Sequence, residues 1–71
     1  MVVEIKFVND SQRVRIDKCA TIIAIPKASK KPFTVTDMNS FSPDPNYSYV
    51  FSGELRLHAD GSKIEYVLFE V

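Results

Sequence analysis

The sequence predicts a small all-β protein: an antiparallel barrel or roll of the SH3-like or OB-like kind, with five to six short strands and a hairpin at each end of the chain. Apolar and polar residues alternate over several short stretches, which is the period of a half-buried strand. Turn-forming residues separate these stretches. Because 71 residues suffice for one domain with a thin core, we expect residues 1–71 to form a single β domain with minimal helix.

The N-terminal hairpin is predicted from residues 3–7 and 13–16, which alternate apolar with charged side chains on either side of a turn-rich segment. We expect Ile5 to lie opposite Ile16, so that the apolar residues share one face. Like charges then oppose each other at two positions on the other face. Diagonal neighbours of opposite charge would relieve that repulsion.

The middle of the chain predicts a bend and then a central strand. The alternation changes phase near Asp17 and Lys18, which indicates a bulge or bend. Residues 20–25 are apolar on both faces, and their β-branched side chains and the stop at Pro26 favour a strand over a short buried helix. Cys19 is expected to be a small core residue, because nothing nearby in the sequence would lower the pKa of its thiol.

The segment between residues 26 and 46 is predicted to consist mainly of loops. Residues 26–32 hold three lysines between two prolines, and residues 33–36 resemble a short strand. Residues 37–46 are too rich in Pro, Asn, Ser and Asp for regular structure. A loop of that length in so small a domain often carries function or folds over the core.

The C-terminal hairpin is predicted from Asp60 and Gly61, which stand between two strand-like runs. This dipeptide favours a two-residue type I′ turn, because Gly adopts a positive φ without steric cost and Asp tolerates one. The turn would set Leu57 opposite Ile64. Gly53, inside the preceding strand, indicates a bend in the sheet.

The last strand carries apolar residues on both of its faces. In the predicted hairpin Ile64, Tyr66 and Leu68 face the core, and the residues between them point away from it. A chain of this size can hardly bury two cores, so a second molecule would cover the outer side. A barrel or sandwich that closes over both sides is the alternative. The candidate protein-binding residues are Val50, Val67, Phe69 and Val71.

We therefore expect a non-catalytic binding protein that contacts another protein, or a second copy of itself, through the C-terminal hairpin and an exposed strand edge. Its size suits a small accessory subunit or an inhibitor. The first residues contain no continuous apolar block, so we expect a soluble cytoplasmic protein without a signal peptide or membrane contact.

The alternative hypothesis is a small β-barrel that binds single-stranded nucleic acid. Lys and Arg outnumber Asp and Glu by seven to three in residues 1–36, whereas only two oppose six in residues 37–71. Interleaving of the two halves in the fold would erase this asymmetry. The aromatic residues that could stack on bases are Phe33, Phe41, Tyr47 and Tyr49. The two tyrosines share a strand face with Leu55, which favours a place in the core. The candidate nucleic-acid-binding residues are Arg13, Arg15, Lys27, Lys30, Lys31 and Phe33.

The sequence offers few groups for catalysis, so we expect no enzyme. The only histidine, His58, stands beside the predicted turn, where a solvated role is the simpler interpretation. One cysteine permits no internal disulfide, and one Cys with one His does not build a structural zinc site. Two glycines exclude a Gly-rich phosphate loop. We therefore assign no catalytic, cofactor-binding or metal-binding residue.

Overall fold

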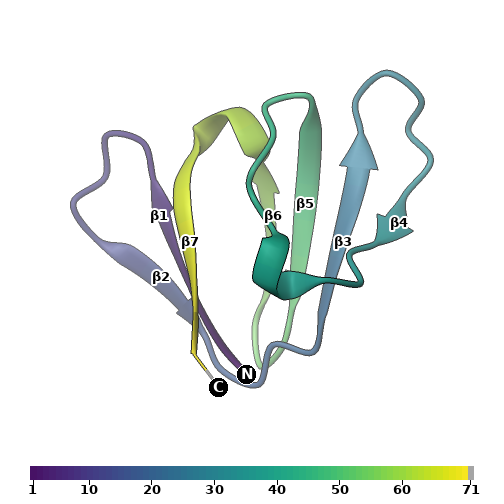
Figure 1. Cartoon of the computed structure of the whole chain (residues 1–71). Coiled ribbons are helices and arrows are strands. Elements are labelled where there is room, and N and C mark those ends of the chain that lie inside the picture. Colours follow the sequence, from purple (N-terminus) through teal and green to yellow (C-terminus); the bar gives the residue numbers. More distant parts are fainter. Residues whose placement is uncertain (71) are drawn as a thin grey trace.

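The strands form two antiparallel sheets (Figure 1). The structure is a computed structural model that describes residues 1–70, apart from the side chain of Asn39. In the first sheet the order is β2 (Arg13–Ile16), β1 (Val2–Phe7) and β7 (Ile64–Glu70). In the second sheet it is β4 (Phe33–Thr34), β3 (Thr21–Pro26), β5 (Tyr47–Ser52) and β6 (Arg56–Asp60). Two short 3-10 turns, η1 (Met38–Ser40) and η2 (Gly61–Lys63), complete the elements of the described chain.

The all-β prediction is confirmed, with seven strands in residues 1–70 instead of five or six. The SH3-like or OB-like barrel stays a prediction, because the described strands divide into two sheets with no shared ladder. β3 lies between β4 and β5, which confirms that residues 20–25 provide a central strand. No helix in residues 1–70 is long and apolar enough to span a membrane.

The N-terminal hairpin forms as predicted, but its register is shifted by two residues. Ile5 lies opposite Val14 and not opposite Ile16. The observed register places Glu4 opposite Arg15 and within 3.2 Å of the Arg13 guanidinium. The pairing of Glu4 with Arg15 is attractive, and the apolar side chains keep the same face. Lys6 lies opposite Arg13, a like charge, but it forms an ion pair at 2.7 Å with Glu65 on the other neighbouring strand.

A sharp bend carries the chain from the first sheet to the second, where the phase change of the sequence predicts one. Lys18 has φ 55°, a left-handed conformation that turns the backbone after β2. Cys19 follows and is 3% exposed, so it is a core residue as expected. Its backbone N–H donates to the carbonyl of Met1 at 2.8 Å, which ties the bend to the start of β1.

The predicted C-terminal hairpin is wrong. β6 pairs with β5, and β7 pairs with β1 in the other sheet, so Asp60 and Gly61 begin a connection between sheets. The Asp60 carboxylate accepts the N–H of Ser62 and starts the η2 turn. Gly61 has no positive φ. A glycine is required at this position for steric reasons, because a Cβ there would collide with the backbone oxygen of Asp44 and lie 2.7 Å from that of Tyr47.

The C-terminal half nevertheless contains a hairpin, formed by β5 and β6 around residues 53–55. Gly53 begins this turn, and its N–H donates to the carbonyl of Leu55 at 2.9 Å. A Cβ at Gly53 would lie 2.6 Å from the backbone oxygen of Asp17. The turn therefore packs directly on the bend that joins the two sheets.

β7 turns the opposite set of side chains toward the core from the predicted one. Val67 and Phe69 pack against the core, whereas Tyr66 and Leu68 are 37% and 43% exposed. The register between β7 and β1 shifts near the end of β1. Because one extra residue in a strand reverses which side chains face inward, the prediction was correct for Ile64 and wrong for the strand beyond it.

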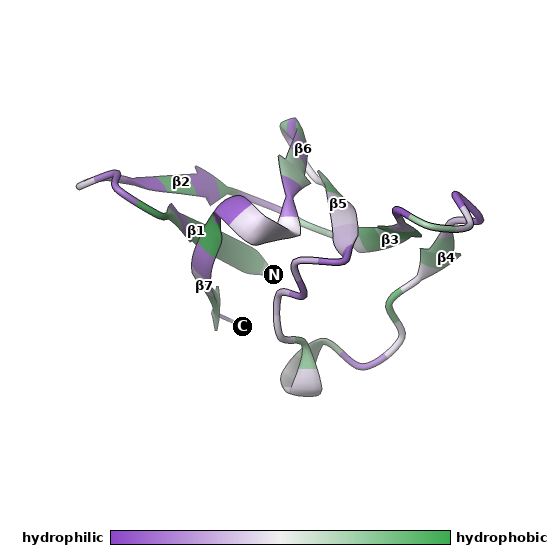
Figure 2. Ribbon diagram, turned by 90° about the horizontal axis from the view of Figure 1, so that it is seen from above, coloured by the Kyte–Doolittle hydropathy of each residue, from purple (hydrophilic) through white to green (hydrophobic). Residues whose placement is uncertain are grey.

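The core lies between the two sheets, and residues 37–46 close its open side (Figure 2). The ring of Phe41, from this loop, lies 6.0 Å from that of Phe69 on β7 and 6.2 Å from that of Phe51 on β5. The loop thus folds over the core and contacts both sheets. The largest fully buried side chains are Phe51, Ile5, Ile16, Ile22 and Val3.

Candidate binding pocket

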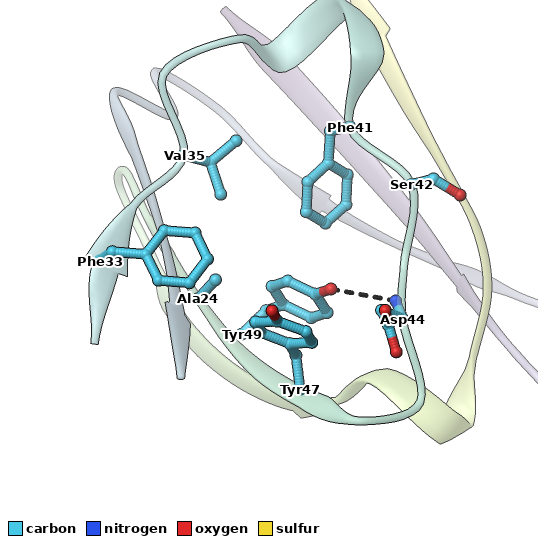
Figure 3. Close-up of a pocket in the computed structure, with 8 residues that line it drawn as sticks. All are labelled: Ala24, Phe33, Val35, Phe41, Ser42, Asp44, Tyr47 and Tyr49. Atoms are coloured by element: carbon cyan, nitrogen blue, oxygen red, sulfur yellow. Dashed lines mark hydrogen bonds between the residues drawn. The ribbon is translucent and has the colours of Figure 1, made fainter. Parts of the chain in front are cut away.

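One end of the second sheet carries a pocket of about 240 Å³ that opens to solvent (Figure 3). We call it the aromatic pocket. Two walls come from the sheet and its continuation after β4, and the third comes from residues 41–44 of the loop. Its lining residues are Ala24, Phe33, Val35, Phe41, Ser42, Asp44, Tyr47 and Tyr49.

The pocket exists because a small residue stands between two large ones in one row of the sheet. Ala24 of β3 pairs with Phe33 on one side and with Tyr49 on the other. Side chains of paired residues stand side by side on the same face. The methyl group of Ala24 therefore forms a low floor between two aromatic walls.

The rings around this floor hold one another in fixed orientations. Tyr47 and Tyr49 are stacked at 6.1 Å with 15° between their planes. Phe33 stands edge-on to Tyr47 at 5.9 Å, and Phe41 stands edge-on to Tyr49 at 5.0 Å. Edge-to-face and offset pairs of this kind are favourable. The pocket is therefore largely preformed.

Asp44 fixes the loop wall and carries the only charge among the described residues of the lining. Its backbone N–H donates to the Tyr49 hydroxyl at 3.0 Å, and its Oδ1 accepts the N–H of Asn46 at 2.8 Å. Burial raises the pKa of the Tyr49 phenol, although the N–H from Asp44 opposes this. Tyr49 is therefore neutral at physiological pH and retains a proton to donate.

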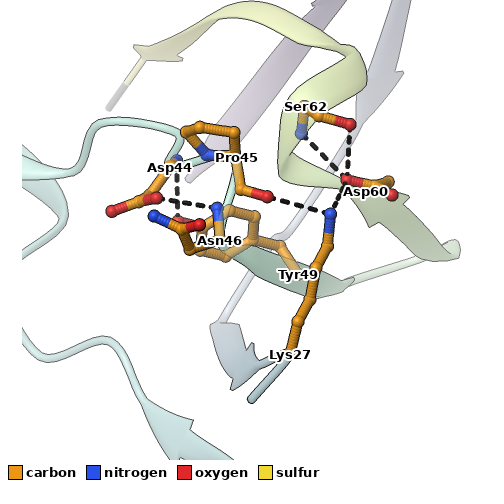
Figure 4. Close-up of polar contacts among 7 residues, drawn as sticks. All are labelled: Lys27, Asp44, Pro45, Asn46, Tyr49, Asp60 and Ser62. Atoms are coloured by element: carbon orange, nitrogen blue, oxygen red, sulfur yellow. Dashed lines mark hydrogen bonds and ion pairs between the residues drawn. The ribbon is translucent and has the colours of Figure 1, made fainter.

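The basic loop between β3 and β4, residues 27–32, is tied to the same wall at its first residue (Figure 4). The Lys27 ammonium donates to the Asp60 carboxylate at 2.6 Å and to the carbonyl of Pro45 at 2.9 Å. The hydrogen bond from Lys27, followed by those from Ser62, lowers the pKa of Asp60 below its ordinary range. Lys27 is consequently a structural anchor with its charge already paired.

Lys30 and Lys31 stand in the loop that leads into Phe33, a wall of the aromatic pocket, and their charges are unpaired among the described residues. Both are exposed, and neither forms an ion pair within residues 1–70. Lys30 has φ 57°, and its N–H donates to the carbonyl of Pro26 at 2.8 Å, which closes the loop. Lys31 stands two residues before Phe33, a pocket wall.

The structure brings together four of the six residues of the nucleic-acid hypothesis. Lys27, Lys30, Lys31 and Phe33 share the basic loop and its end. Arg13 and Arg15 lie on β2 in the other sheet, where each is paired with a carboxylate, of Glu4 and Asp17. Three ion pairs, Lys6–Glu65, Lys18–Glu54 and Lys27–Asp60, join the basic and acidic halves of the chain, so folding reduces the charge asymmetry.

The protein-binding candidates do not form one exposed patch among the described residues. Val50 is 3% exposed and lies on β5 between Ile23 and His58. Val67 and Phe69 face the core, and Val71 lies outside the described residues. Their role in protein contact stays a prediction.

The single histidine and the single cysteine both lie outside the aromatic pocket. His58 is exposed on β6. Burial raises the pKa of the Cys19 thiol, which keeps it protonated. No group of three His, Cys, Asp or Glu side chains within residues 1–70 could hold a metal ion.

Sequence reasoning missed Ala24, Val35, Ser42 and Asp44 as site residues. Ala24 gave a usable signal, because it is the smallest side chain inside a strand of β-branched residues. Asp44 gave none, since its place depends on how the loop folds back. Comparisons with protein-family models, curated proteins and solved structures found no match to this chain.

Proposed function

We propose that this protein is a non-catalytic binding protein and that the aromatic pocket is its binding site, which receives one flat or apolar group of a ligand. The observation that supports the proposal is the hollow above Ala24, walled by the rings of Phe33, Phe41, Tyr47 and Tyr49 and open to solvent. Ligand sites are concave, mainly apolar and preformed, with a few polar groups at their edge. Here Asp44 and Ser42 supply those groups.

The stability cost of the hollow supports the same proposal. A 71-residue domain has a thin core, and unfilled space beside apolar side chains forfeits packing energy. A leucine at position 24 would reach into the hollow and recover part of it. A site that lowers stability in this way is typical of functional sites, where stability is traded for activity.

Titration with indole, followed by amide chemical shifts in NMR, tests the proposal. Indole is flat and neutral, and we expect it to shift the amides of Ala24, Phe33, Tyr47 and Tyr49, with a dissociation constant on the order of millimolar. Ala24→Leu should abolish these shifts by filling the floor of the pocket. Ala20→Leu, at an exposed position before the same strand, is the matched control and should bind indole normally.

If indole shifts amides elsewhere in the chain, or shifts none, the aromatic pocket is not a binding site. If Ala24→Leu remains folded and binds indole like the unsubstituted protein, the assigned floor is wrong. Both results are read from the same spectra that report whether the variant is folded.

A second candidate function is self-association through the edge strand β7. β7 ends the first sheet, and Tyr66 and Leu68 are exposed side by side on its outer face. An exposed edge strand can pair with the same strand of a second copy. Light scattering should then show a dimer that Leu68→Lys dissociates, and a monomer at all concentrations would eliminate this candidate.

A further inference from the structure

We propose that the ligand of the aromatic pocket is a nucleotide unit, with its base between the rings, its phosphate on Lys30 and Lys31, and an amino group of the base on the Asp44 carboxylate. The inference rests on the proposed function of the pocket and adds the chemical class of the ligand. The unit could be a free nucleotide or one residue of a single strand, because both present the same base and phosphate.

The walls of the pocket suit a base. A nucleobase is flat and apolar on its faces, and it stacks on aromatic side chains regardless of sequence. Phe33 is 50% exposed at the mouth, so a ring is available to an incoming base without movement of the core. Tyr49 and Phe41, by contrast, are held in the edge-on pair described above and form a fixed inner wall.

The rim suits a phosphate on the side of the basic loop. Lys27 anchors this loop by donating hydrogen bonds to the Pro45 carbonyl and the Asp60 carboxylate, so its charge is already paired. Lys30 and Lys31 remain exposed and without ion pairs within residues 1–70, between that anchor and Phe33. A ligand that inserts a ring beside Phe33 therefore places its attached anionic group near two uncompensated cations.

The opposite side of the mouth suits a hydrogen-bond donor. Oδ1 of Asp44 accepts the backbone N–H of Asn46, and Oδ2 has no hydrogen-bond partner in residues 1–70. A carboxylate accepts hydrogen bonds only, so it favours a base edge that offers donors. An exocyclic amino group projects from the ring and offers two N–H bonds, whereas thymine and uracil offer only the ring N3–H. Cytosine, adenine and guanine carry such an amino group.

A methylated ammonium group is the competing ligand, because rings and a carboxylate also attract cations. Lys30 and Lys31 disfavour it, since they would lie beside the bound cation with like charge. The charges of the rim therefore favour a ligand with an anionic part over a cationic one.

Binding of CMP and of a short fluorescent oligodeoxycytidine tests the inference. CMP should shift the amides of Ala24, Phe33 and Tyr47 in NMR, and the oligonucleotide should bind more tightly if the natural source is a single strand. Raising salt from about 50 mM to about 200 mM should weaken oligonucleotide binding about sevenfold, the effect of two phosphate contacts on a single strand. Oligothymidine should bind about fivefold more weakly than oligodeoxycytidine.

The variant pair Lys30→Asn/Lys31→Gln removes the two charges of the rim. Asn tolerates the left-handed backbone of position 30, so the loop is preserved. We expect affinity for CMP and oligodeoxycytidine to fall about tenfold. The control pair Arg15→Gln/Lys18→Asn removes two charges before β3, and it includes the same substitution at a lysine of positive φ. It should leave affinity unchanged, because its positions lie roughly 20 Å away, the length of the strand.

The possible failures are distinguishable. If indole shifts the pocket amides but CMP and oligodeoxycytidine do not, the nucleotide inference is overturned and the pocket proposal stands. If tetramethylammonium shifts them and CMP does not, the ligand is a cation and the inference is again overturned. Equal loss of affinity in both charge-removal pairs would show non-specific attraction, and equal binding of oligothymidine and oligodeoxycytidine would overturn the role of Asp44.

Discussion

The strand pair β3–β5 lies wholly in the core at one position and, two residues further along, is buried but also lines the aromatic pocket. Ile22 lies opposite Phe51, and both side chains are completely buried. Ala24 lies opposite Tyr49, and above this pair the chain leaves a pocket of about 240 Å³. The same two strands thus supply two fully buried side chains of the core and part of the lining of the candidate site.

The largest expected effect sharpens this difference between the two rows. Phe51→Ala removes a fully buried ring and should destabilise the protein by about 3–5 kcal/mol, enough to unfold much of a domain of this size. Phe33→Ala removes a ring that is 50% exposed and should cost about 1 kcal/mol or less. Urea denaturation followed by circular dichroism measures both. Similar losses of stability in the two variants would contradict the contrast between a ring buried in the core and a half-exposed ring at the mouth of the pocket.

Gly61→Ala tests the connection that holds the loop wall of the pocket. The new Cβ would meet the backbone oxygens of Asp44 and Tyr47, neither of which can move as a side chain can. We expect destabilisation of about 1–3 kcal/mol in urea denaturation and altered amide shifts in residues 44–47.

Ser62→Ala is the control for Gly61→Ala. It removes one exposed hydrogen bond, from the Ser62 hydroxyl to Asp60, and should cost about 1 kcal/mol or less. A Gly61→Ala variant as stable as the unsubstituted protein would mean that β6 and β7 are not joined by the close approach described above.

Ala24→Leu, unlike the substitutions above, should increase the free energy of unfolding. Three additional carbon atoms would cover apolar surface of the neighbouring rings and stabilise the protein by about 1 kcal/mol. The matched change Ala20→Leu, at an exposed position, should alter the free energy of unfolding by less than about 0.5 kcal/mol. Marked destabilisation by Ala24→Leu would show that position 24 is already filled and that no usable hollow exists there.

The smallest effect concerns the anchor of the basic loop. The pKa of Asp60 is lowered in the folded protein, so the unfolded chain takes up the proton first as pH falls. The contribution of this carboxylate to stability is therefore complete above its unfolded pKa of about 3.9 and declines below it. Because Asp60 is exposed, the decline is small, and Lys27→Met should flatten it in acid titrations of the urea midpoint. An identical acid dependence in the variant would contradict the anchoring role of Lys27.

Local patterns predicted which residues form strands, because alternation and turn formers act over a few residues. They predicted the β1–β2 hairpin, the bend near Lys18 and the central place of β3. These local patterns did not predict which strands pair in the C-terminal half of the chain. Asp60 and Gly61 have the composition of a hairpin turn, but Gly61 is set by a close approach to the distant loop that no local pattern records.

The faces of β7 and the pocket show the same limit. A register shift against β1 reverses the inward and outward side chains of β7, and it depends on a partner strand about sixty residues away in sequence. The sequence identified Lys30, Lys31 and Phe33 as neighbours because they are adjacent in the chain. It could not add Asp44, which reaches the same mouth only through the fold of the loop.

Intermolecular nuclear Overhauser effects between bound indole and the protein test the central claim most directly, because they locate the ligand by contact. The claim that the hollow above Ala24 is the binding site predicts effects from indole protons to the rings of Phe33 and Phe41, which stand on opposite walls. Effects confined to Tyr66 and Leu68 on the outer face of β7 would contradict it.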